Sequence, residues 1–351
     1  MTLLLGLHVV KGASYPAPKE ADFAIRNFRF GDGETLPELR MHYATLGSLR
    51  RDAGGAALNA VLILHGTTGS WKQFTSPQFA DVLFGQGQLL DANRYYIVLP
   101  DNIGHGGSSK PSDGLKGRFP SYDYNDMIAA QHQLLTDGLG VNHLRLVMGT
   151  SMGCMHSWVW GETYPDMMDA LMPLACLPVQ IAGRNRVWRK AVMDSIRQDP
   201  AWKNGAYTEE PLQGIRSALY LLLIATSTPL QWQKNYPTRD QADKFLDGYI
   251  EQRLHSVDAN DMLYAVDSSR NYDPSPNLEK IKARVMYINS ADDFINPPEL
   301  GIAEREIKRV PHGQFHLLPI SDQTRGHGTH TVAAVWKQYL EGLLQESEPK
   351  R

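Results

Sequence analysis

Short runs of consecutive apolar residues recur along this chain, and they constrain its fold more than any other feature. They cover residues 60–64, 95–99, 144–148, 170–174 and 285–288. Runs rich in Val, Ile and Leu that lack polar alternation are typical of parallel strands covered on both faces. Helical apolar spacing occurs between them, in residues 125–139 and 152–164. This alternation predicts βαβ units, and hence an α/β fold with a mostly parallel, doubly wound sheet.

The rest of the chain predicts a hairpin before this sheet and a helical insertion within it. Residues 23–30 and 38–46 are separated by Gly31-Asp32-Gly33, which indicates an antiparallel hairpin. The strand-like apolar runs stop near residue 178 and resume at Arg284. We therefore expect a core formed by residues 1–177 and 278–351, and a helical cap formed by residues 178–277. A cap inserted there would cover the carboxyl edge of the sheet, where α/β enzymes bind their ligands.

The composition is that of an ordinary soluble globular protein. The chain has 351 residues, of which 42% are hydrophobic and 21% are charged, and its formal net charge is −3. This balance argues against a protein that binds nucleic acid or a membrane surface through charge. No apolar stretch reaches the ~18 residues of a membrane-spanning helix, so we expect no stable membrane insertion. Cys154 and Cys176 are too few for a disulfide scaffold, and their apolar surroundings predict reduced core residues.

The first residues leave two alternatives for the location of the protein. The segment from Met1 to Val10 is apolar but too short to span a bilayer, and no Lys or Arg precedes it as in a signal peptide. Gly12-Ala13-Ser14 would nevertheless suit a cleavage site. An N-terminal arm on a cytoplasmic protein is the favoured interpretation. The alternative is a truncated export signal on a periplasmic or secreted protein.

The pentapeptide Gly149-Thr150-Ser151-Met152-Gly153 predicts a nucleophile. It follows an apolar run directly and opens the helical stretch 152–164. In a G-x-S-x-G elbow the turn from strand to helix is so tight that its flanks need glycine, and the serine hydroxyl is exposed above the sheet. The amino end of the helix also brings partial positive charge and free N–H groups to a developing oxyanion. A serine at this position, rather than a carboxylate, favours acyl transfer by Ser151.

The turn after the run 60–64 predicts the oxyanion hole. It reads His65-Gly66-Thr67-Thr68-Gly69, and enzymes with such an elbow take one donor from this loop and one from the residue after the nucleophile. We expect the backbone N–H groups of Thr67 and Met152 to be these donors. His65 is expected to be a structural hydrogen-bonding residue. His105, in the Gly-rich turn DNIGHG, is expected to be a surface or supporting residue.

The acid is expected after the cap, because the partners in this architecture follow in the order serine, acid, histidine. The strand-like run RVMYINS ends shortly before Asp293, and three residues lie between Asp293 and Pro297. An aspartate that lies just past a strand and shortly before a proline fits the acid position. Asp293 is therefore the candidate, and Asp292 is the alternative.

The base is expected just before the last helical stretch. His327 lies there between two glycines, whereas His330 would fall in the first turn of that helix and act as a supporting residue. In this triad His327 takes the Ser151 proton, and the aspartate stabilises the imidazolium. His312 and His316 have a metal-like spacing but lack a carboxylate motif, so the sequence predicts no metal site and no cofactor.

With these residues placed, the sequence resembles α/β-hydrolases of the branch that contains the homoserine O-acetyltransferases. The resemblance runs from the N-terminal hairpin to the last helix. Its most specific segments are GTSMGCMHSWVWGETYPD around Ser151, GRNRVWRKAVMDSIRQDPAWKNGAY at residues 183–207, SADDFINPPE, and GHGT at His327. The resemblance implies the α/β-hydrolase fold with an inserted helical cap. It also implies a homodimer formed through the cap, although the oligomeric state stays open.

Three departures from the acetyltransferase pattern bear on the substrate. Those enzymes resemble one another in an aspartate directly after the catalytic histidine, which helps to hold the substrate amine, whereas this chain has Gly328. The oxyanion turn reads HGTTG rather than HALTG, and the DNIGHGGSS segment looks like that of general hydrolases. Because a lost charge partner weakens recognition strongly, the resemblance implies a similar scaffold with a different substrate.

The expected function is hydrolysis of a small-molecule acyl ester by a serine carboxylic ester hydrolase, through an acyl-serine intermediate. The alternative is a CoA-dependent O-acyltransferase of the homoserine O-acetyltransferase type, and a non-catalytic binding protein is the third hypothesis. Four aromatic residues of the cap either line an apolar pocket or pack within the cap: Trp188, Trp202, Tyr207 and Trp232. The acyl chain and the alcohol are not specified by the sequence.

Overall fold

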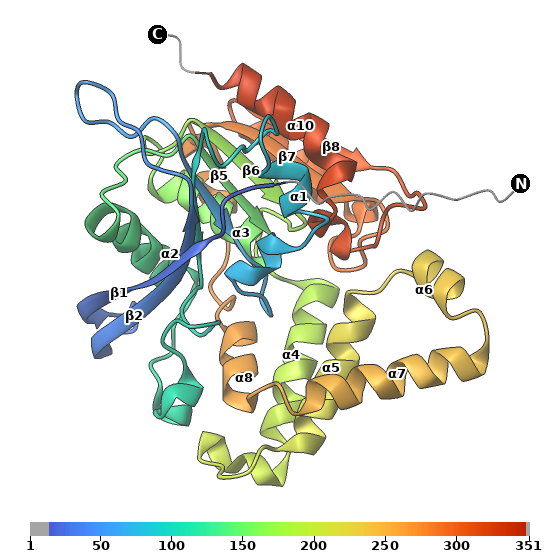
Figure 1. Cartoon of the computed structure of the whole chain (residues 1–351). Coiled ribbons are helices and arrows are strands. Elements are labelled where there is room, and N and C mark those ends of the chain that lie inside the picture. The colour runs from blue at the N-terminus through green and yellow to red at the C-terminus, as the bar shows by residue number, and fades with distance from the viewer. Residues whose placement is uncertain (1–13, 349–351) are drawn as a thin grey trace, which may run out of the picture.

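The computed structural model describes residues 14–348, and a mostly parallel sheet of eight strands lies at its centre (Figure 1). The strands are β1 (Lys19–Arg29), β2 (Thr35–Leu46), β3 (Ala60–Leu64), β4 (Tyr96–Pro100), β5 (Leu146–Thr150), β6 (Ala170–Leu174), β7 (Arg284–Ser290) and β8 (Gly313–Leu318). Their order is β1-β2-β4-β3-β5-β6-β7-β8. Only the β1–β2 and β2–β4 pairs are antiparallel. The predictions of a mostly parallel α/β sheet and an N-terminal hairpin are confirmed.

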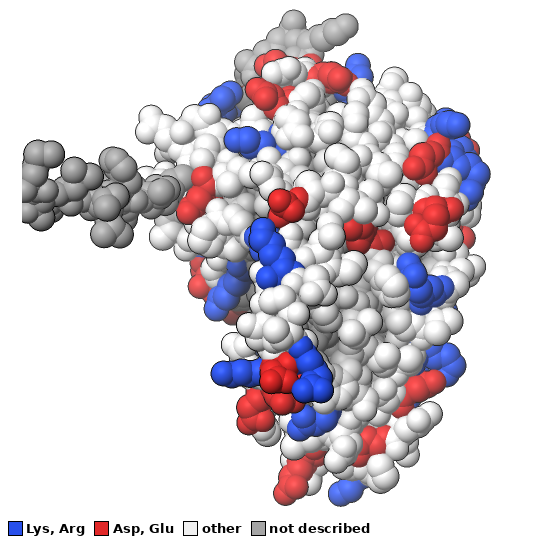
Figure 2. Space-filling model, turned by 90° about the vertical axis from the view of Figure 1, so that its right-hand side faces the viewer, with Lys and Arg blue, Asp and Glu red and all other residues white. Residues whose placement is uncertain are grey.

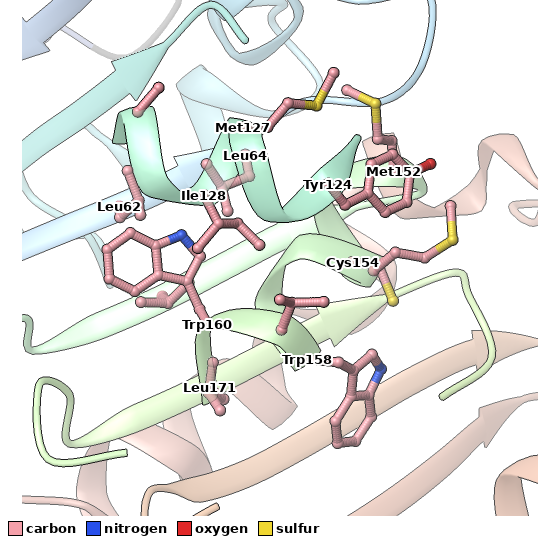
Figure 3. Close-up of a cluster of buried hydrophobic side chains, with 14 of the residues drawn as sticks. Leu62, Leu64, Tyr124, Met127, Ile128, Met152, Cys154, Trp158, Trp160 and Leu171 are labelled. Carbon is pink, nitrogen blue, oxygen red and sulfur yellow. The ribbon is translucent and has the colours of Figure 1, made fainter. Parts of the chain in front are cut away.

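Helices cover both faces of the sheet, as the continuous apolar runs predict. Short α1 (Ala80–Leu83) and α10 (Ala333–Glu346) pack on one face, and α2 (Tyr124–Gln133), α3 (Met152–Thr163) and α9 (Ile302–Glu306) pack on the other. Alternate residues of β3 point to opposite sides, so that Ile63 joins the cluster around α10 and Leu62 joins the cluster around α3. Figure 3 shows the second cluster, in which Leu62 meets residues of α2 and α3.

Two elements differ from the prediction in their bounds. β5 begins two residues after the start of the run 144–148, because Leu144 pairs only through an isolated bridge with Met168. α2 ends at Gln133, and residues Leu134–Gly138 continue as a π-helical turn. The shift of β5 matters for the site, because the strand now ends at Thr150, directly before Ser151.

Between β6 and β7 the chain forms a helical insert, which Figure 1 shows grouped below the sheet. Its α-helices are α4 (Gly183–Arg197), α5 (Leu212–Ala225), α6 (Pro229–Asn235), α7 (Arg239–Leu254) and α8 (Ala259–Asp267). The insert has its own buried apolar cluster, which includes Val192, Ile215 and Ile250. The division into a core and a cap at residues 178 and 277 stays a prediction.

The prediction of reduced cysteines is wrong, because Cys154 and Cys176 form a disulfide. Cys154 lies in the first turn of α3, and Cys176 follows the end of β6. β5 and β6 are parallel neighbours, so the segments that follow them start close together, and the two Cα atoms are 5.8 Å apart. That distance lies within the usual range for a disulfide. Apolar surroundings suit a thiol and a disulfide equally, which is why they did not reveal the bond.

Acidic and basic side chains are interspersed on the face shown in Figure 2. This distribution agrees with the formal net charge of −3. Among residues 14–348, no helix is both long enough and apolar enough to cross a membrane. The segment from Met1 to Val10, expected to be an arm or an export signal, lies outside the described residues.

Candidate active site

Ser151 lies on a sharp turn between β5 and α3. Its backbone has φ 57° and ψ −110°, a conformation that a residue other than glycine rarely adopts. The flanking glycines have no room for a side chain. A Cβ atom at Gly149 would lie 1.9 Å from the Gly153 carbonyl oxygen, and one at Gly153 would lie 1.9 Å from the Leu64 carbonyl oxygen. The local geometry is therefore that of the strand-turn-helix elbow which the pentapeptide predicts.

The structure brings Ser151, His327 and Asp293 together from three distant parts of the chain. His327 Nε2 lies 2.8 Å from Ser151 Oγ, and His327 Nδ1 lies 2.9 Å from Asp293 Oδ2. Asp293 follows β7, and His327 precedes the short 3-10 turn Gly328–Thr331 before α10. Parallel strands bring their carboxyl ends to one edge of the sheet, which is why residues so far apart in sequence meet there.

The carboxylate of Asp293 is buried and well supplied with hydrogen bonds. The Ile295 N–H donates to Oδ1 over 2.8 Å, and the Asn296 Nδ2 donates to Oδ2 over 2.9 Å. Burial raises the pKa of Asp293, but the charge of His327 and these hydrogen bonds outweigh it and hold the pKa below its usual value. Asp292, the alternative, accepts a hydrogen bond from the Gly326 N–H over 3.0 Å instead.

Two backbone N–H groups near Ser151 are free to bind an oxyanion. Within residues 14–348, neither the Thr67 N–H nor the Met152 N–H has an acceptor. Thr67 lines the same cavity as Ser151, and Met152 is the first residue of α3, where the helix dipole is positive. The Gly66 N–H, by contrast, donates to Gln73 Oε1 over 3.3 Å. The loop therefore leaves the Thr67 donor free while it occupies the Gly66 donor.

Gln73 is a supporting residue that the sequence did not reveal. Its Nε2 donates to Thr150 Oγ1 over 2.8 Å, so the side chain joins the oxyanion loop to the residue before Ser151. Gln73 lies in the 3-10 turn Trp71–Thr75, and a glutamine in such a turn is ordinary. No motif could have identified it, because its importance depends on two partners that are distant in sequence.

Three histidines lie near the site; His65 and His105 are buried, and His330 is partly buried. Burial, followed by the neighbouring His105, lowers the pKa of His65 to about 3, and burial together with His327 lowers that of His330 to about 3. Burial lowers the pKa of His105 as well, and its Nε2 lies 2.7 Å from the Thr67 carbonyl oxygen. None of the three histidines forms a hydrogen bond with Ser151 within residues 14–348, and the burial of His105 rules out the expected surface position.

A cavity of about 1260 Å³ opens over Ser151 and His327. The insert supplies a wall of apolar side chains together with Arg184, Arg189 and Arg253, and the core supplies the oxyanion loop and the loops after β6 and β7. The larger apolar side chains that line the cavity are Met155, Leu177, Val179, Ile181, Trp188, Leu219, Leu222, Tyr249, Val257, Met262, Ile295, Leu300 and Ile302. Of the four aromatic residues singled out, only Trp188 lines the cavity, and Trp202, Tyr207 and Trp232 do not.

The insert also holds the loops that carry Asp293 and His327. Arg184 of α4 stacks on Phe294 with its guanidinium 3.7 Å from the ring centre. Gln231 of α6 donates to the carbonyl groups of Asp322 and Thr324 over 2.9 and 3.1 Å. In the part of the chain that the structure describes, no cluster of three or more His, Cys, Asp or Glu side chains is arranged to hold a metal ion.

Comparison with known proteins agrees with this fold. The sequence profile of the alpha/beta hydrolase fold family matches residues 59–322. A probable acyltransferase from Methanothermobacter thermautotrophicus is 29% identical over 279 residues, which cover 79% of this chain and 84% of that protein. A homoserine O-acetyltransferase from Pelobacter propionicus is 28% identical over 335 residues, which cover 84% of this chain and 87% of that protein.

Among solved structures, an acetylester hydrolase from Corynebacterium glutamicum has the same fold. The TM-score is 0.80 at 20% identity, and the match covers 94% of this chain and 96% of that chain. The resemblance to the homoserine O-acetyltransferase branch and the predicted fold class are thereby confirmed. This chain belongs to the alpha/beta hydrolase fold family.

Proposed function

We propose that this protein is a serine carboxylic ester hydrolase that acts through an acyl-serine intermediate. The observation that carries the proposal is the row of hydrogen bonds from Ser151 through His327 to Asp293, with lengths of 2.8 and 2.9 Å. The fold shared with an acetylester hydrolase supports it. We also propose that residues 178–277 act as a cap, since the insert lines the cavity over Ser151.

In the acylation step, Ser151 Oγ attacks the ester carbonyl while His327 Nε2 takes its proton. The oxyanion that forms accepts hydrogen bonds from the N–H groups of Thr67 and Met152. When the tetrahedral intermediate collapses, the alcohol leaves and takes the proton from His327. Asp293 stays ionised and stabilises the imidazolium, a role that its lowered pKa suits.

In the deacylation step, water takes the place of the alcohol. His327 removes a proton from the water, whose oxygen attacks the acyl carbonyl. The same two N–H groups stabilise the second oxyanion, and Ser151 recovers its proton from His327 as the carboxylic acid leaves. Both halves of the reaction use one histidine, which alternates between base and acid.

The substrate we propose is a small acyl ester without a free amine. The cavity walls are largely apolar around Met155, Leu219 and Met262, which suits an uncharged acyl or alkyl group. Gly328 also lines the cavity and offers no counter-charge to an ammonium group at the position where the acetyltransferases resemble one another in an aspartate.

A CoA-dependent O-acyltransferase is the second candidate. The similarity to a homoserine O-acetyltransferase over 84% of the chain favours it. In such an enzyme the acyl group of the acyl-serine would pass to an alcohol instead of water. The missing aspartate argues against homoserine as that alcohol. The two candidates differ in the acyl donor, which is an ester or a CoA thioester, and in the acyl acceptor, which is water or an alcohol.

Turnover of p-nitrophenyl acetate and butyrate tests the proposal. We expect hydrolysis by the wild type and a loss of at least about 10³-fold in Ser151→Ala, with an unchanged circular dichroism spectrum. Activity retained in this variant would contradict the assignment. Acetyl-CoA consumption that depends on an alcohol and outpaces hydrolysis would favour the transferase. A failure of a fluorophosphonate probe to label Ser151 would favour a non-catalytic binding protein.

A further inference from the structure

We infer that Gln131, Asn102 and His65 form a buried chain of hydrogen bonds that orients the Thr67 N–H toward the oxyanion. The inference rests on the proposed function, because it gives these residues a part in the oxyanion hole of that reaction. All three side chains have 0% exposure, and none of them lines the cavity over Ser151. They are therefore positioning residues that act through Thr67.

The chain begins at Trp160 on α3. Trp160 Nε1 donates to Gln131 Oε1 over 2.7 Å, and an indole nitrogen can only donate. This orients the Gln131 amide, so that its Nε2 donates to Asn102 Oδ1. The Asn102 amide is oriented in turn, with its Nδ2 3.1 Å from His65 Nε2. Figure 3 shows the Trp160 indole extending from α3 toward α2, the helix that carries Gln131.

His65 continues the chain to the oxyanion loop. The backbone N–H of Asn102 donates to His65 Nε2 over 3.1 Å, and a backbone N–H can only donate. In the neutral ring the proton therefore lies on Nδ1. Nδ1 lies 2.8 Å from the Gly66 carbonyl oxygen, so its N–H donates to that oxygen.

The Gly66 carbonyl and the Thr67 N–H belong to the same peptide unit. Because the peptide is planar and trans, a hydrogen bond that holds the carbonyl also sets the direction of the N–H on its other side. The Gly69 N–H holds the same carbonyl over 2.9 Å. The hydrogen bond from His65 to the Gly66 carbonyl therefore sets the direction of the Thr67 N–H.

Every link in this chain donates in the same direction, from Trp160 toward the oxyanion. Hydrogen bonds arranged head to tail in a buried site polarise one another, which makes the last donor stronger. Donors that are aimed before the reaction at the atom where charge develops contribute most to stabilising the transition state. The chain therefore favours turnover rather than substrate binding.

The variant Gln131→Leu interrupts the chain of hydrogen bonds at a residue that does not line the cavity. We expect kcat for p-nitrophenyl acetate, per folded enzyme, to fall about 10-fold with KM within about 2-fold, since loss of a whole oxyanion donor typically costs 10²–10³ in kcat. The affinity for a trifluoromethyl ketone, which forms a tetrahedral adduct with Ser151, should fall by the same factor as kcat/KM. If Gln131 had a purely structural role, the variant would have a lower melting temperature but an unchanged kcat/KM and an unchanged affinity for the ketone.

Gln133→Leu is the matched control, because it makes the same change at the end of α2 to a partly buried side chain that has no hydrogen bond within residues 14–348. It should keep wild-type kcat and KM. Trp160→Phe serves as a second variant if Gln131→Leu does not fold, because it removes the first N–H of the chain while it keeps an aromatic ring at that position. It should lower kcat without changing KM. A folded Gln131→Leu or Trp160→Phe with wild-type kcat would overturn the inference.

The tautomer of His65 gives a readout that needs no substrate. Nitrogen-15 NMR of the wild type should show a neutral ring protonated at Nδ1 near neutral pH. A ring protonated at Nε2, or a charged ring, would reverse or break the chain and overturn the inference. If the wild type hydrolyses no ester and Ser151 is not labelled, the proposed function fails, while this measurement still decides the direction of the chain.

Discussion

His327 Nδ1 lies 2.9 Å from Asp293 Oδ2, and the adjacent carboxylate of Asp292 supports the same loop in another way. Asp292 Oδ2 accepts the Gly326 N–H over 3.0 Å, one residue before the histidine. One carboxylate therefore holds the imidazole ring, and its neighbour holds the backbone. Only the first can stabilise an imidazolium directly.

This difference predicts unequal effects for two isosteric substitutions. Asp293→Asn should lower kcat for p-nitrophenyl butyrate by about 10³–10⁴-fold, because an amide favours the wrong histidine tautomer and carries no charge. Asp292→Asn should lower kcat by less than about 10-fold, since its amide oxygen can still accept the Gly326 N–H. Initial rates of both variants at equal folded concentration check this prediction. Equal losses in the two variants would remove the basis for choosing Asp293.

The lowered pKa of Asp293 predicts a pH dependence of stability. Since the folded carboxyl binds a proton less readily than the unfolded one, it stabilises the fold above its ordinary pKa of about 3.9. This contribution is lost as the pH falls through the lower folded-state pKa. Melting temperatures between about pH 6 and pH 3 should therefore fall more steeply for the wild type than for Asp293→Asn. Parallel curves for the two proteins would contradict the prediction.

The disulfide between Cys154 and Cys176 predicts a loss of stability on reduction. Its two cysteines are 22 residues apart, and closing a loop of that length stabilises the folded state by about 3 kcal/mol. Cys154→Ala combined with Cys176→Ala should lower the free energy of unfolding by about that amount in urea titrations.

The control for this prediction is a titration with reductant, which should weaken the wild type and leave the double variant unchanged. Two free thiols in the denatured, unreduced wild type would show that the bond does not form. Disulfides persist mainly in oxidising compartments, so a bond found in the native protein would favour the periplasmic or secreted alternative over the cytoplasm.

The tight packing around Gly153 predicts that alanine there lowers the stability of the fold, whereas alanine at Gly342 does not. A Cβ atom at Gly153 would lie 1.9 Å from the Leu64 carbonyl oxygen, so Gly153→Ala must move α3 away from β3. We expect it to cost at least about 3 kcal/mol of unfolding free energy. Gly342→Ala in α10 has no atom within 4 Å of the new Cβ and should stabilise the protein by about 0.5–1 kcal/mol. A tolerated Gly153→Ala would contradict the tight packing of the elbow.

Much of the fold could be predicted from local sequence. β3 and β6 coincide with the apolar runs 60–64 and 170–174, because a strand covered on both faces needs apolar side chains at every position. Ser151, His327 and Asp293 could be proposed because each follows a strand or precedes a helix in a recognisable local pattern. The bounds of β5 and α2 were less predictable, since an isolated bridge and a π-helical turn leave no distinct pattern in the sequence.

The sequence could not reveal relationships that depend on distance alone. Cys154 and Cys176 have the surroundings of two core thiols, and only the parallel pairing of β5 with β6 brings them together. Gln131 is an ordinary polar residue in an amphipathic helix until its contacts with Trp160 and Asn102 are known. Asp292 and Asp293 are adjacent, so spacing favours one of them only weakly.

The class of fold and the candidate nucleophile and base could be inferred from the sequence alone, because strand burial and the tight elbow each demand particular residue types at particular local spacings. The folded chain was needed to show which aspartate lies beside His327, which cysteines are joined and which buried amides lie behind Thr67. These relationships are set by hydrogen-bond lengths and approaches of a few ångströms between segments that are far apart in the chain. Such distances depend on how the whole sheet and its helices pack, and no local pattern of residues records them.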